Sequence, residues 1–119
     1  MMLTGIVLDA PDARELAAFY RRLLGWSATQ DEPDWVHLAA PGGGAGLSFQ
    51  TEKLYARPVW PAQPGAPQMS VHLDIRVDDL DEACAHAERA GATKAEFQPQ
   101  EHVRVYLDPA GHPFCLYVD

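Results

Sequence analysis

A histidine and an aspartate two positions apart, His72 and Asp74, are the residues of this sequence best suited to chemistry. The apolar residues Leu73 and Ile75 alternate with them and indicate a β-strand, in which successive side chains point to opposite faces. The imidazole and the carboxylate should therefore meet on one face, where a carboxylate favours the charged form of a histidine. The pair is a candidate for acid–base catalysis or for ligand contact, and the structural alternative is a histidine that merely bonds to its neighbour.

Polar and aromatic residues gather on one face of the other expected strands as well. The apolar residues that alternate with them are expected to form the core, and they are Val36, Leu38, Leu47, Phe49, Leu73, Ile75, Val103, Val105, Phe114 and Leu116. A plain wet sheet face is rich in Lys, Glu and Thr, whereas tryptophan, tyrosine, histidine and one arginine indicate a lined cleft. The candidate ligand-binding residues are Trp35, His37, Ser48, Gln50, His72, Asp74, Arg104, Cys115 and Tyr117, with His102 and Tyr106 on the same face.

The two cysteines, Cys84 and Cys115, are too few for a disulfide framework, and no CxxC metal clip is present. Cys84 falls on the apolar stripe of an expected helix and is interpreted as a core residue. Cys115 falls on the cleft face, where it is either a packed, inert thiol or, beside a cation such as Arg104, an activated one. Free thiols are the default in a reducing compartment, so we expect a soluble, cytoplasmic protein.

The charge balance argues against two classes of partner. The 119 residues carry 9 Lys and Arg against 17 Asp and Glu, a formal net charge of -8 that repels phosphate backbones and anionic lipid. No apolar run approaches the roughly 18 residues of a membrane span. We expect no nucleic-acid partner and no membrane segment, and the acidic surface serves either solubility alone or the attraction of a cationic ligand.

The second half of the chain is a near-copy of the first when Cys115 is aligned with Ser48. In the first half the expected elements are a strand at residues 6–8, a helix capped by Asp12 and stopped by Gly25, and strands at residues 26–29, 35–39 and 45–51. In the second half they are a strand at residues 71–77, a helix at residues 79–90, and strands at residues 93–97, 104–107 and 114–118. Each half is thus a βαβββ module.

A proline-rich segment separates the modules. Pro58, Pro61, Pro64 and Pro67 surround Trp60, a composition that favours an extended linker. We expect one domain over residues 1–119, with a first module at about 1–52, a linker at about 53–68 and a second module at about 69–119. Trp60 is either a lid on the cleft or a cover for the edge of the core.

Several motifs that punctuate the two modules occur together in a known family. They are residues 16–20 (LAAFY) with residues 24–26 (LGW), residues 72–80 (HLDIRVDDL), Gly91-Ala92, and residues 108–114 (DPAGHPF). With these motifs the chain resembles the glyoxalase-like branch of the vicinal-oxygen-chelate superfamily, which includes glyoxalases, bleomycin-resistance proteins and dioxygenases. The resemblance implies an α+β fold in which two βαβββ modules form a curled, eight-stranded cup that holds the binding or active site.

Enzymes of that superfamily usually hold a divalent metal through ligands on the first and last strands of each module. Carried over residue by residue, these places fall on Gly5, Ser48, His72 and Cys115. Gly5 has no side chain, Ser48 is a poor ligand for a divalent ion, and catalytic sites normally supply about three protein ligands. The resemblance therefore predicts neither a metal nor another cofactor, which puts glyoxalase and dioxygenase chemistry in doubt.

The first functional hypothesis is a small-molecule-binding protein that works without a metal, similar to the bleomycin-resistance proteins that sequester antibiotics. The alternative is an enzyme acting on a small organic substrate. It would use either metal-free acid–base chemistry, with His72 and Asp74 as candidate catalytic residues, or a divalent metal held by other ligands, as a lyase, isomerase or dioxygenase. We also expect a homodimer, because an open cup leaves sheet edges to be covered and related domains often pair their modules across chains.

Overall fold

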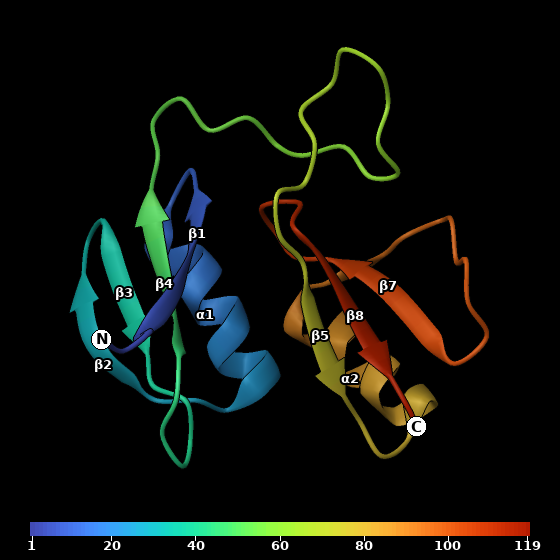
Figure 1. Ribbon diagram of the computed structural model, residues 1–119, viewed down its shortest axis with the longest axis horizontal. Helices are drawn as coiled ribbons and strands as arrows, with labels where there is room; N and C mark the ends of the chain where they lie inside the picture. The colour runs from blue at the N-terminus through green and yellow to red at the C-terminus, as the bar shows by residue number, and fades with distance from the viewer. The chain divides into compact units, whose positions relative to one another are not determined.

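The computed structural model describes all 119 residues, which divide into two compact units, Met1–Tyr55 and Ala56–Asp119 (Figure 1). Each unit is an α+β module with one helix and one four-stranded mixed sheet, in the expected βαβββ order. No helix has the length and apolar character that crossing a membrane would require.

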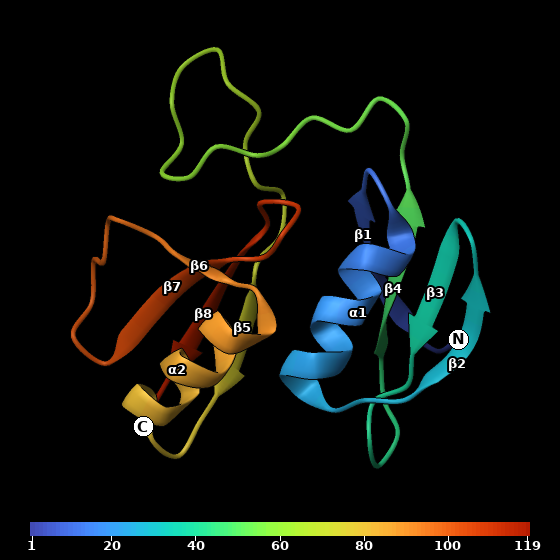
Figure 2. The ribbon, with the colours of Figure 1, turned by 180° about the vertical axis from the view of Figure 1, so that it is seen from behind.

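The first unit contains one helix and four strands. They are β1 (Gly5–Ala10), α1 (Ala13–Leu24), β2 (Ala28–Glu32), β3 (Trp35–Leu38) and β4 (Gly46–Thr51). The strand order in the sheet is β1-β4-β3-β2, with β1 parallel to β4 and the remaining neighbours antiparallel. Helix α1 lies across one face of this sheet (Figure 2) and leaves the other face open.

Helix α1 begins and ends where side-chain and backbone chemistry dictate. The Asp12 carboxylate accepts hydrogen bonds from the backbone N–H groups of Arg14 (3.0 Å) and Glu15 (3.3 Å), which have no partner inside the helix. At the other end Gly25 adopts the left-handed conformation with φ of 73°, which glycine enters without steric cost. The apolar stripe between these caps is buried against the sheet, where Tyr20 stacks on Phe49 at a ring separation of 5.3 Å.

The second unit repeats the arrangement. Its elements are β5 (Leu73–Arg76), α2 (Leu80–Ala90), β6 (Thr93–Lys94), β7 (Val103–Leu107) and β8 (Pro113–Tyr117). The strand order is β5-β8-β7-β6, with β5 parallel to β8, and α2 packs over β7 and β8. Asp79 caps α2 at its start, and Gly91, with φ of 120°, ends it.

Strand β6 is shorter than the sequence predicts, two residues in place of residues 93–97. The side-chain amide of Gln98 accepts a hydrogen bond from Val105 N–H (2.9 Å) and donates to Val105 C=O (3.0 Å). It also donates to the carbonyl of Ala95 at 2.8 Å. A glutamine side chain thus meets the hydrogen-bonding groups of β7 where a continuing strand would have met them, and the ladder ends early.

The prediction for β7 is wrong by one residue in its choice of faces. Tyr106 pairs with Phe114 and Arg104 pairs with Leu116, and directly paired residues share a face, so both lie on the side that α2 covers. Tyr106 is fully buried, and its hydroxyl donates to Glu88 Oε2 of the helix at 3.2 Å. Conversely Val105 pairs with Cys115, on the open face.

The residues before β5 fold onto the second unit. Arg57 donates from Nη1 to the carbonyl of Pro109 at 2.9 Å, and its aliphatic stem lies where a side chain at Gly111 would stand. Gly111, with φ of 93°, is therefore required twice, by its backbone conformation and by this close approach. Trp60 packs on Phe97 with ring centroids 5.8 Å apart, so its indole lies against the second unit.

Candidate functional site

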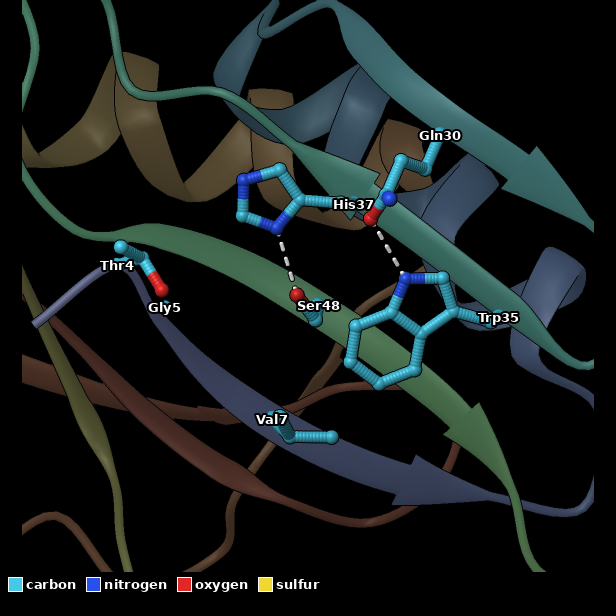
Figure 3. A pocket seen from close by; sticks show the side chains of 7 residues that line it. All are labelled: Thr4, Gly5, Val7, Gln30, Trp35, His37 and Ser48. Atoms are coloured by element: carbon cyan, nitrogen blue, oxygen red, sulfur yellow. Dashed lines mark hydrogen bonds between the residues drawn. The ribbon is translucent and has the colours of Figure 1, made fainter.

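The open face of the first unit contains a cavity of about 310 Å³ (Figure 3). Its wall combines one aromatic ring with several polar side chains and a patch of backbone, from Thr4, Gly5, Val7, Gln30, Trp35, His37 and Ser48. Strand alternation and register explain this grouping, because Gly5 and Val7 of β1, Ser48 of β4 and His37 of β3 all occupy the face opposite the helix.

His37 and Ser48 form the most closely coupled pair of this cavity. They are cross-strand partners, and His37 Nδ1 lies 2.6 Å from Ser48 Oγ. Ser48 is almost fully buried, with 3% of its surface exposed, whereas His37 is half-buried and reaches the cavity. The hydroxyl therefore fixes the orientation of the ring, and Nε2 remains the ring nitrogen available for other contacts.

The imidazole of His37 has room because two neighbouring residues are glycines. A Cβ at Gly46 would lie 2.9 Å from His37 Nε2 and would also collide with the carbonyl of Leu38. A Cβ at Gly5 would meet His37 Cε1 at 3.4 Å and Ser48 Oγ at 3.5 Å. The imidazole of His37 can occupy its position only because residue 46 is a glycine, whereas Gly5 only leaves open space at the cavity floor.

Trp35 forms the aromatic part of the same wall. Its indole N–H donates to Gln30 Oε1 at 2.8 Å, so the ring is held by a side chain of the neighbouring strand β2. The amide nitrogen of Gln30 belongs to the same bonded group and adds a donor at the cavity wall. A ring held in this way gives a flat apolar surface with directed polar groups beside it, which suits a planar ligand.

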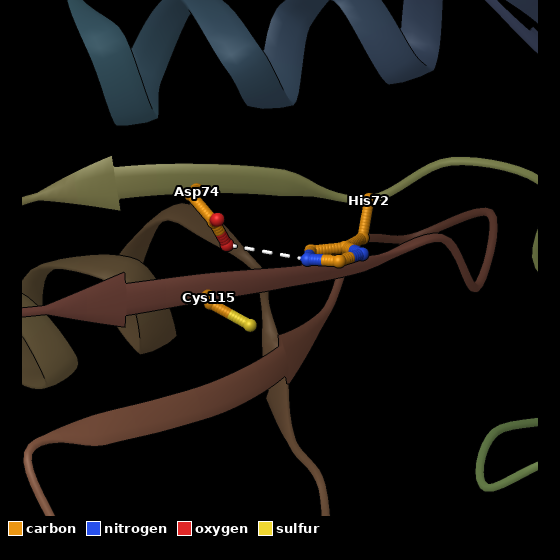
Figure 4. A group of neighbouring side chains, drawn as sticks. All are labelled: His72, Asp74 and Cys115. Atoms are coloured by element: carbon orange, nitrogen blue, oxygen red, sulfur yellow. Dashed lines mark ion pairs between the residues drawn. The ribbon is translucent and has the colours of Figure 1, made fainter.

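A second cavity, of about 240 Å³, lies on the open face of the second unit. It is lined by His72, Asp74, Gln100, Val103, Cys115 and Tyr117. Three of these side chains point toward one another (Figure 4): His72 Nε2 lies 3.3 Å from Asp74 Oδ1, and a ligand atom of Cys115 lies within 4.8 Å of both partners. His72 and Asp74 therefore meet as their shared strand face predicts.

Cys115 is the least exposed member of this cluster, and its thiol is a weaker acid than an ordinary cysteine. Burial raises the pKa of its thiol, and the charge and hydrogen-bonding capacity of the Asp74 carboxylate raise it further. At neutral pH the sulfur therefore keeps its proton. The thiolate activation considered from the sequence does not occur here, because Asp74, not Arg104, is the charged neighbour.

The metal-ligand set implied by the family is only partly present at these positions. Gly5 offers no donor, and the Ser48 hydroxyl is buried and bonded to His37, so the first unit's half of that set does not fit a divalent ion. In the second unit His72 and Cys115 lie beside a third donor, Asp74, which the family positions do not include. The full family set does not fit, whereas the cluster in the second unit has the number and chemistry of donors that a metal site needs.

The two cavities collect seven of the nine candidate ligand-binding residues. Trp35, His37 and Ser48 line the first cavity, and His72, Asp74, Cys115 and Tyr117 line the second. Gln50 is exposed next to Trp35 and lines neither. Arg104 lies on the helix-covered face, and it donates to the carbonyl of Glu101 at 2.8 Å.

Two glutamines of the cavity walls were missed by sequence reasoning. Gln30 faces the first cavity because β2 extends to Glu32, whereas the predicted strand ended at residue 29. The short distance between this strand and Trp35 was the available signal. Extending the predicted strand up to a tight turn before Trp35 would have included Gln30. Gln100 lies in the loop before β7, where no periodic pattern assigns a direction to a side chain.

The profile of a family described as the glyoxalase-like domain matches residues 5–117 of the chain. No curated protein matches the chain. The match extends over both modules, from the first strand to the last, and includes every residue that lines the two cavities except Thr4.

Solved structures show the same fold at low sequence identity. A glyoxalase/bleomycin resistance protein/dioxygenase family enzyme from Burkholderia phytofirmans PsJN has a TM-score of 0.75 at 19% identity, covering 99% of this chain and 98% of its own. A glyoxalase-related enzyme from Fulvimarina pelagi has a TM-score of 0.72 at 18% identity, and the match covers 100% of this chain and 88% of that protein. TnmS3, an antibiotic-binding protein from Streptomyces sp. CB03234, has a TM-score of 0.61 at 22% identity, covering 99% and 95%.

Proposed function

We propose that this chain, which belongs to the glyoxalase-like domain family, binds a small organic molecule on the open faces of its sheets. The observation that carries the proposal is the cavity of about 310 Å³ in the first unit, where a fixed indole stands beside the paired side chains of His37 and Ser48. An apolar wall with a few directed polar groups is the usual composition of a small-molecule site.

The chemistry of this wall favours a planar, positively charged ligand. The face of Trp35 attracts flat and cationic groups, and a net charge of -8 raises the local concentration of cations around the protein. His37, oriented by Ser48, then supplies a directed hydrogen bond at one edge of the ligand. The fold shared with the antibiotic-binding protein TnmS3 supports a role in binding or sequestration.

The proposed ligand contacts are Trp35, His37 and Ser48 in the first cavity, with His72, Asp74, Cys115 and Tyr117 in the second. Binding in the first cavity needs no metal, because His37 is the one side chain in its wall that ordinarily ligates transition metals. Its hydrogen-bonded and aromatic groups hold an organic ligand directly.

Calorimetric titration with acridine orange, a planar aromatic cation, tests this proposal. Loss of a buried hydrogen bond in the His37→Ala variant should weaken binding by about 1–3 kcal/mol, roughly fivefold to 150-fold. His102→Ala is the matched control, because His102 is exposed and lines neither cavity. Equal affinities for both variants, or binding that EDTA abolishes and a divalent ion restores, would refute the proposal.

An enzyme acting on a small organic substrate is the second candidate, and the contact between His37 and Ser48 favours it. A hydroxyl 2.6 Å from an imidazole nitrogen has the separation that proton transfer requires. Mass spectrometry of a panel of small aromatic substrates incubated with the protein would distinguish the two candidates. Turnover that His37→Gln abolishes would establish catalysis, whereas recovery of every compound unaltered would leave the binding function.

We further propose that the chain forms a homodimer in the cytoplasm. Strands β1 and β2 end one sheet, β5 and β6 end the other, and such edges offer unpaired backbone groups to a partner. Both cysteines are free thiols, the state that a reducing compartment preserves. Sedimentation velocity at tens of micromolar should give twice the chain mass of 13.1 kDa, and a monomer at that concentration would contradict the proposal.

A further inference from the structure

Three donor atoms of different chemistry converge in the second cavity, among residues that the proposed function also counts as ligand contacts. One ligand atom each from His72, Asp74 and Cys115 lies within 4.8 Å of the other two (Figure 4). We propose that these three side chains bind one thiophilic divalent cation, with Zn²⁺ as the reference ion. The inference does not depend on the binding of an organic molecule in the first unit.

Strand geometry holds the three side chains together. His72 and Asp74 are two residues apart, so they project from the same face at the start of β5. Asp74 pairs directly with Cys115 of β8, and the parallel ladder between these strands fixes that register. Leu73 and Ile75 face the helix-covered side opposite Phe114 and Leu116, so a slip of one residue would expose apolar side chains.

The separations suit a small cation. Ligand atoms about 2.0–2.3 Å from a tetrahedral Zn²⁺ lie roughly 3.3–3.8 Å apart. His72 Nε2 and Asp74 Oδ1 are already 3.3 Å apart. The sulfur of Cys115 lies within 4.8 Å of both atoms, so a small movement of its side chain would bring it to the same spacing. The side chains of His72 and Asp74 are 41% and 62% exposed, so they are free to make this adjustment.

The donor set selects the class of ion. An imidazole, a carboxylate and a thiolate together carry two negative charges, which balance a divalent cation. Sulfur and nitrogen ligands favour Zn²⁺ or Co²⁺ over Mg²⁺ and Ca²⁺, which prefer oxygen. Three protein ligands leave one tetrahedral position open, and the cavity of about 240 Å³ beside them has space for a water molecule there.

Cation binding must replace the proton of Cys115. Asp74 and Cys115 are direct partners in the ladder between β5 and β8, so the carboxylate and the thiol stand side by side. When the cation binds, the sulfur gives its proton to water and both groups turn to the metal. The strand pairing thus holds the carboxylate and the sulfur next to each other before the cation binds.

This ligand set differs from the one that the family resemblance implies. That set draws ligands from both units, and Gly5 and Ser48 cannot supply them. The set proposed here lies entirely on β5 and β8, and Asp74 takes the place of the missing donors. The expectation that no metal binds rested on two donors, His72 and Cys115, and the structure adds the third.

Titration of the full-length, EDTA-treated and desalted protein with Co²⁺ tests the proposal directly. A cobalt ion bound by the thiolate of Cys115 should produce a sulfur-to-cobalt charge-transfer band that saturates at one ion per chain and disappears when Zn²⁺ displaces cobalt. Cys115→Ser should abolish the band. Cys84→Ser is the matched control, because it removes the other thiol, on α2, and should leave the band intact.

Calorimetry with Zn²⁺ assigns the other two ligands. His72→Ala and Asp74→Asn should each weaken Zn²⁺ binding at least tenfold, whereas His102→Ala should leave it unchanged. Both positions are exposed, so circular dichroism should show that the variants fold, and backbone amide shifts on Zn²⁺ addition should be confined to residues near β5 and β8. A missing cobalt band, a band that survives Cys115→Ser, or unchanged Zn²⁺ affinity in His72→Ala and Asp74→Asn would overturn the proposal.

Discussion

The imidazole of His37 lies directly over Gly46, the residue that opens β4, so close that a single added Cβ would be 2.9 Å from its Nε2. The first cavity therefore depends on the absence of a side chain as much as on the residues that line it. Two paired glycines, Gly46 beneath His37 and Gly5 in the cavity wall, differ in how strictly a side chain is excluded at their positions.

Gly46→Ala should destabilise the first unit and displace His37. The new Cβ would collide with the Leu38 carbonyl, which belongs to the paired strand and cannot move freely, so we expect a loss of about 1–3 kcal/mol. Gly5→Ala is the matched control, because its Cβ would find neighbours at 3.4–3.6 Å, ordinary or nearly ordinary contacts. Urea unfolding measures both, and equal losses would show that crowding at Gly46 is relieved.

Tyr106→Ala should be severely destabilising, because the structure places this ring under α2. Removing a fully buried aromatic side chain costs about 3–5 kcal/mol. Tyr106→Phe keeps the ring and removes only the hydroxyl bonded to Glu88, so the loss should be about 1 kcal/mol or less. A small loss of unfolding free energy for Tyr106→Ala would indicate that the ring lies on the open face, as the sequence predicted.

Cys115 should react more slowly with iodoacetamide than an ordinary thiol at the same pH, because burial and Asp74 raise its pKa. The thiolate is the reactive form, so the rate should rise with pH through a midpoint above the usual thiol range. Asp74→Asn removes the negative charge and should shift that midpoint to lower pH. Mass spectrometry of EDTA-treated Cys84→Ser protein follows the reaction of Cys115 alone. An unchanged midpoint in Asp74→Asn would show that Asp74 does not influence the pKa of this thiol.

Arg57→Ala should loosen the residues before β5 without unfolding the second unit. The variant loses one hydrogen bond to the Pro109 carbonyl and the contact of its stem with Gly111, together about 1 kcal/mol. Hydrogen exchange at residues 56–68 should accelerate, while exchange in β7 and β8 should not. Lys53→Ala is the control, because Lys53 is exposed and lies before this segment, and identical exchange in the two variants would argue against an anchoring role.

The helices and most strands could be predicted because their signals are local. Asp12 and Gly25 bracket a helix by chemistry that needs no distant partner, and Asp79 and Gly91 do the same for the second helix. Alternation also placed His72, Asp74 and Cys115 on one face correctly, because Leu73 and Phe114 fix the opposite face.

The face of β7 could not be predicted because its alternation is ambiguous. Val105 and Tyr106 are adjacent, and both are buried, so period-two reasoning fits either choice. The small residues Ala83, Ala87 and Ala90 on α2 decide it, since a helix with short side chains on its inner face can accommodate a tyrosine ring beneath it. That complementarity belongs to packing between elements and is absent from the strand's own sequence.

The anchoring of Arg57 and Trp60 on the second unit affects how the modules could be exchanged between related proteins. Both residues precede β5 by more than ten positions in the sequence, yet their partners, Pro109 and Phe97, lie in the second unit. A chimera joined at the start of β5 would separate these partners, whereas a junction between Tyr55 and Ala56 would transfer them together. The unit that can be transferred intact, by recombination or in a designed chimera, is thus the second βαβββ module together with the proline-rich segment that precedes it.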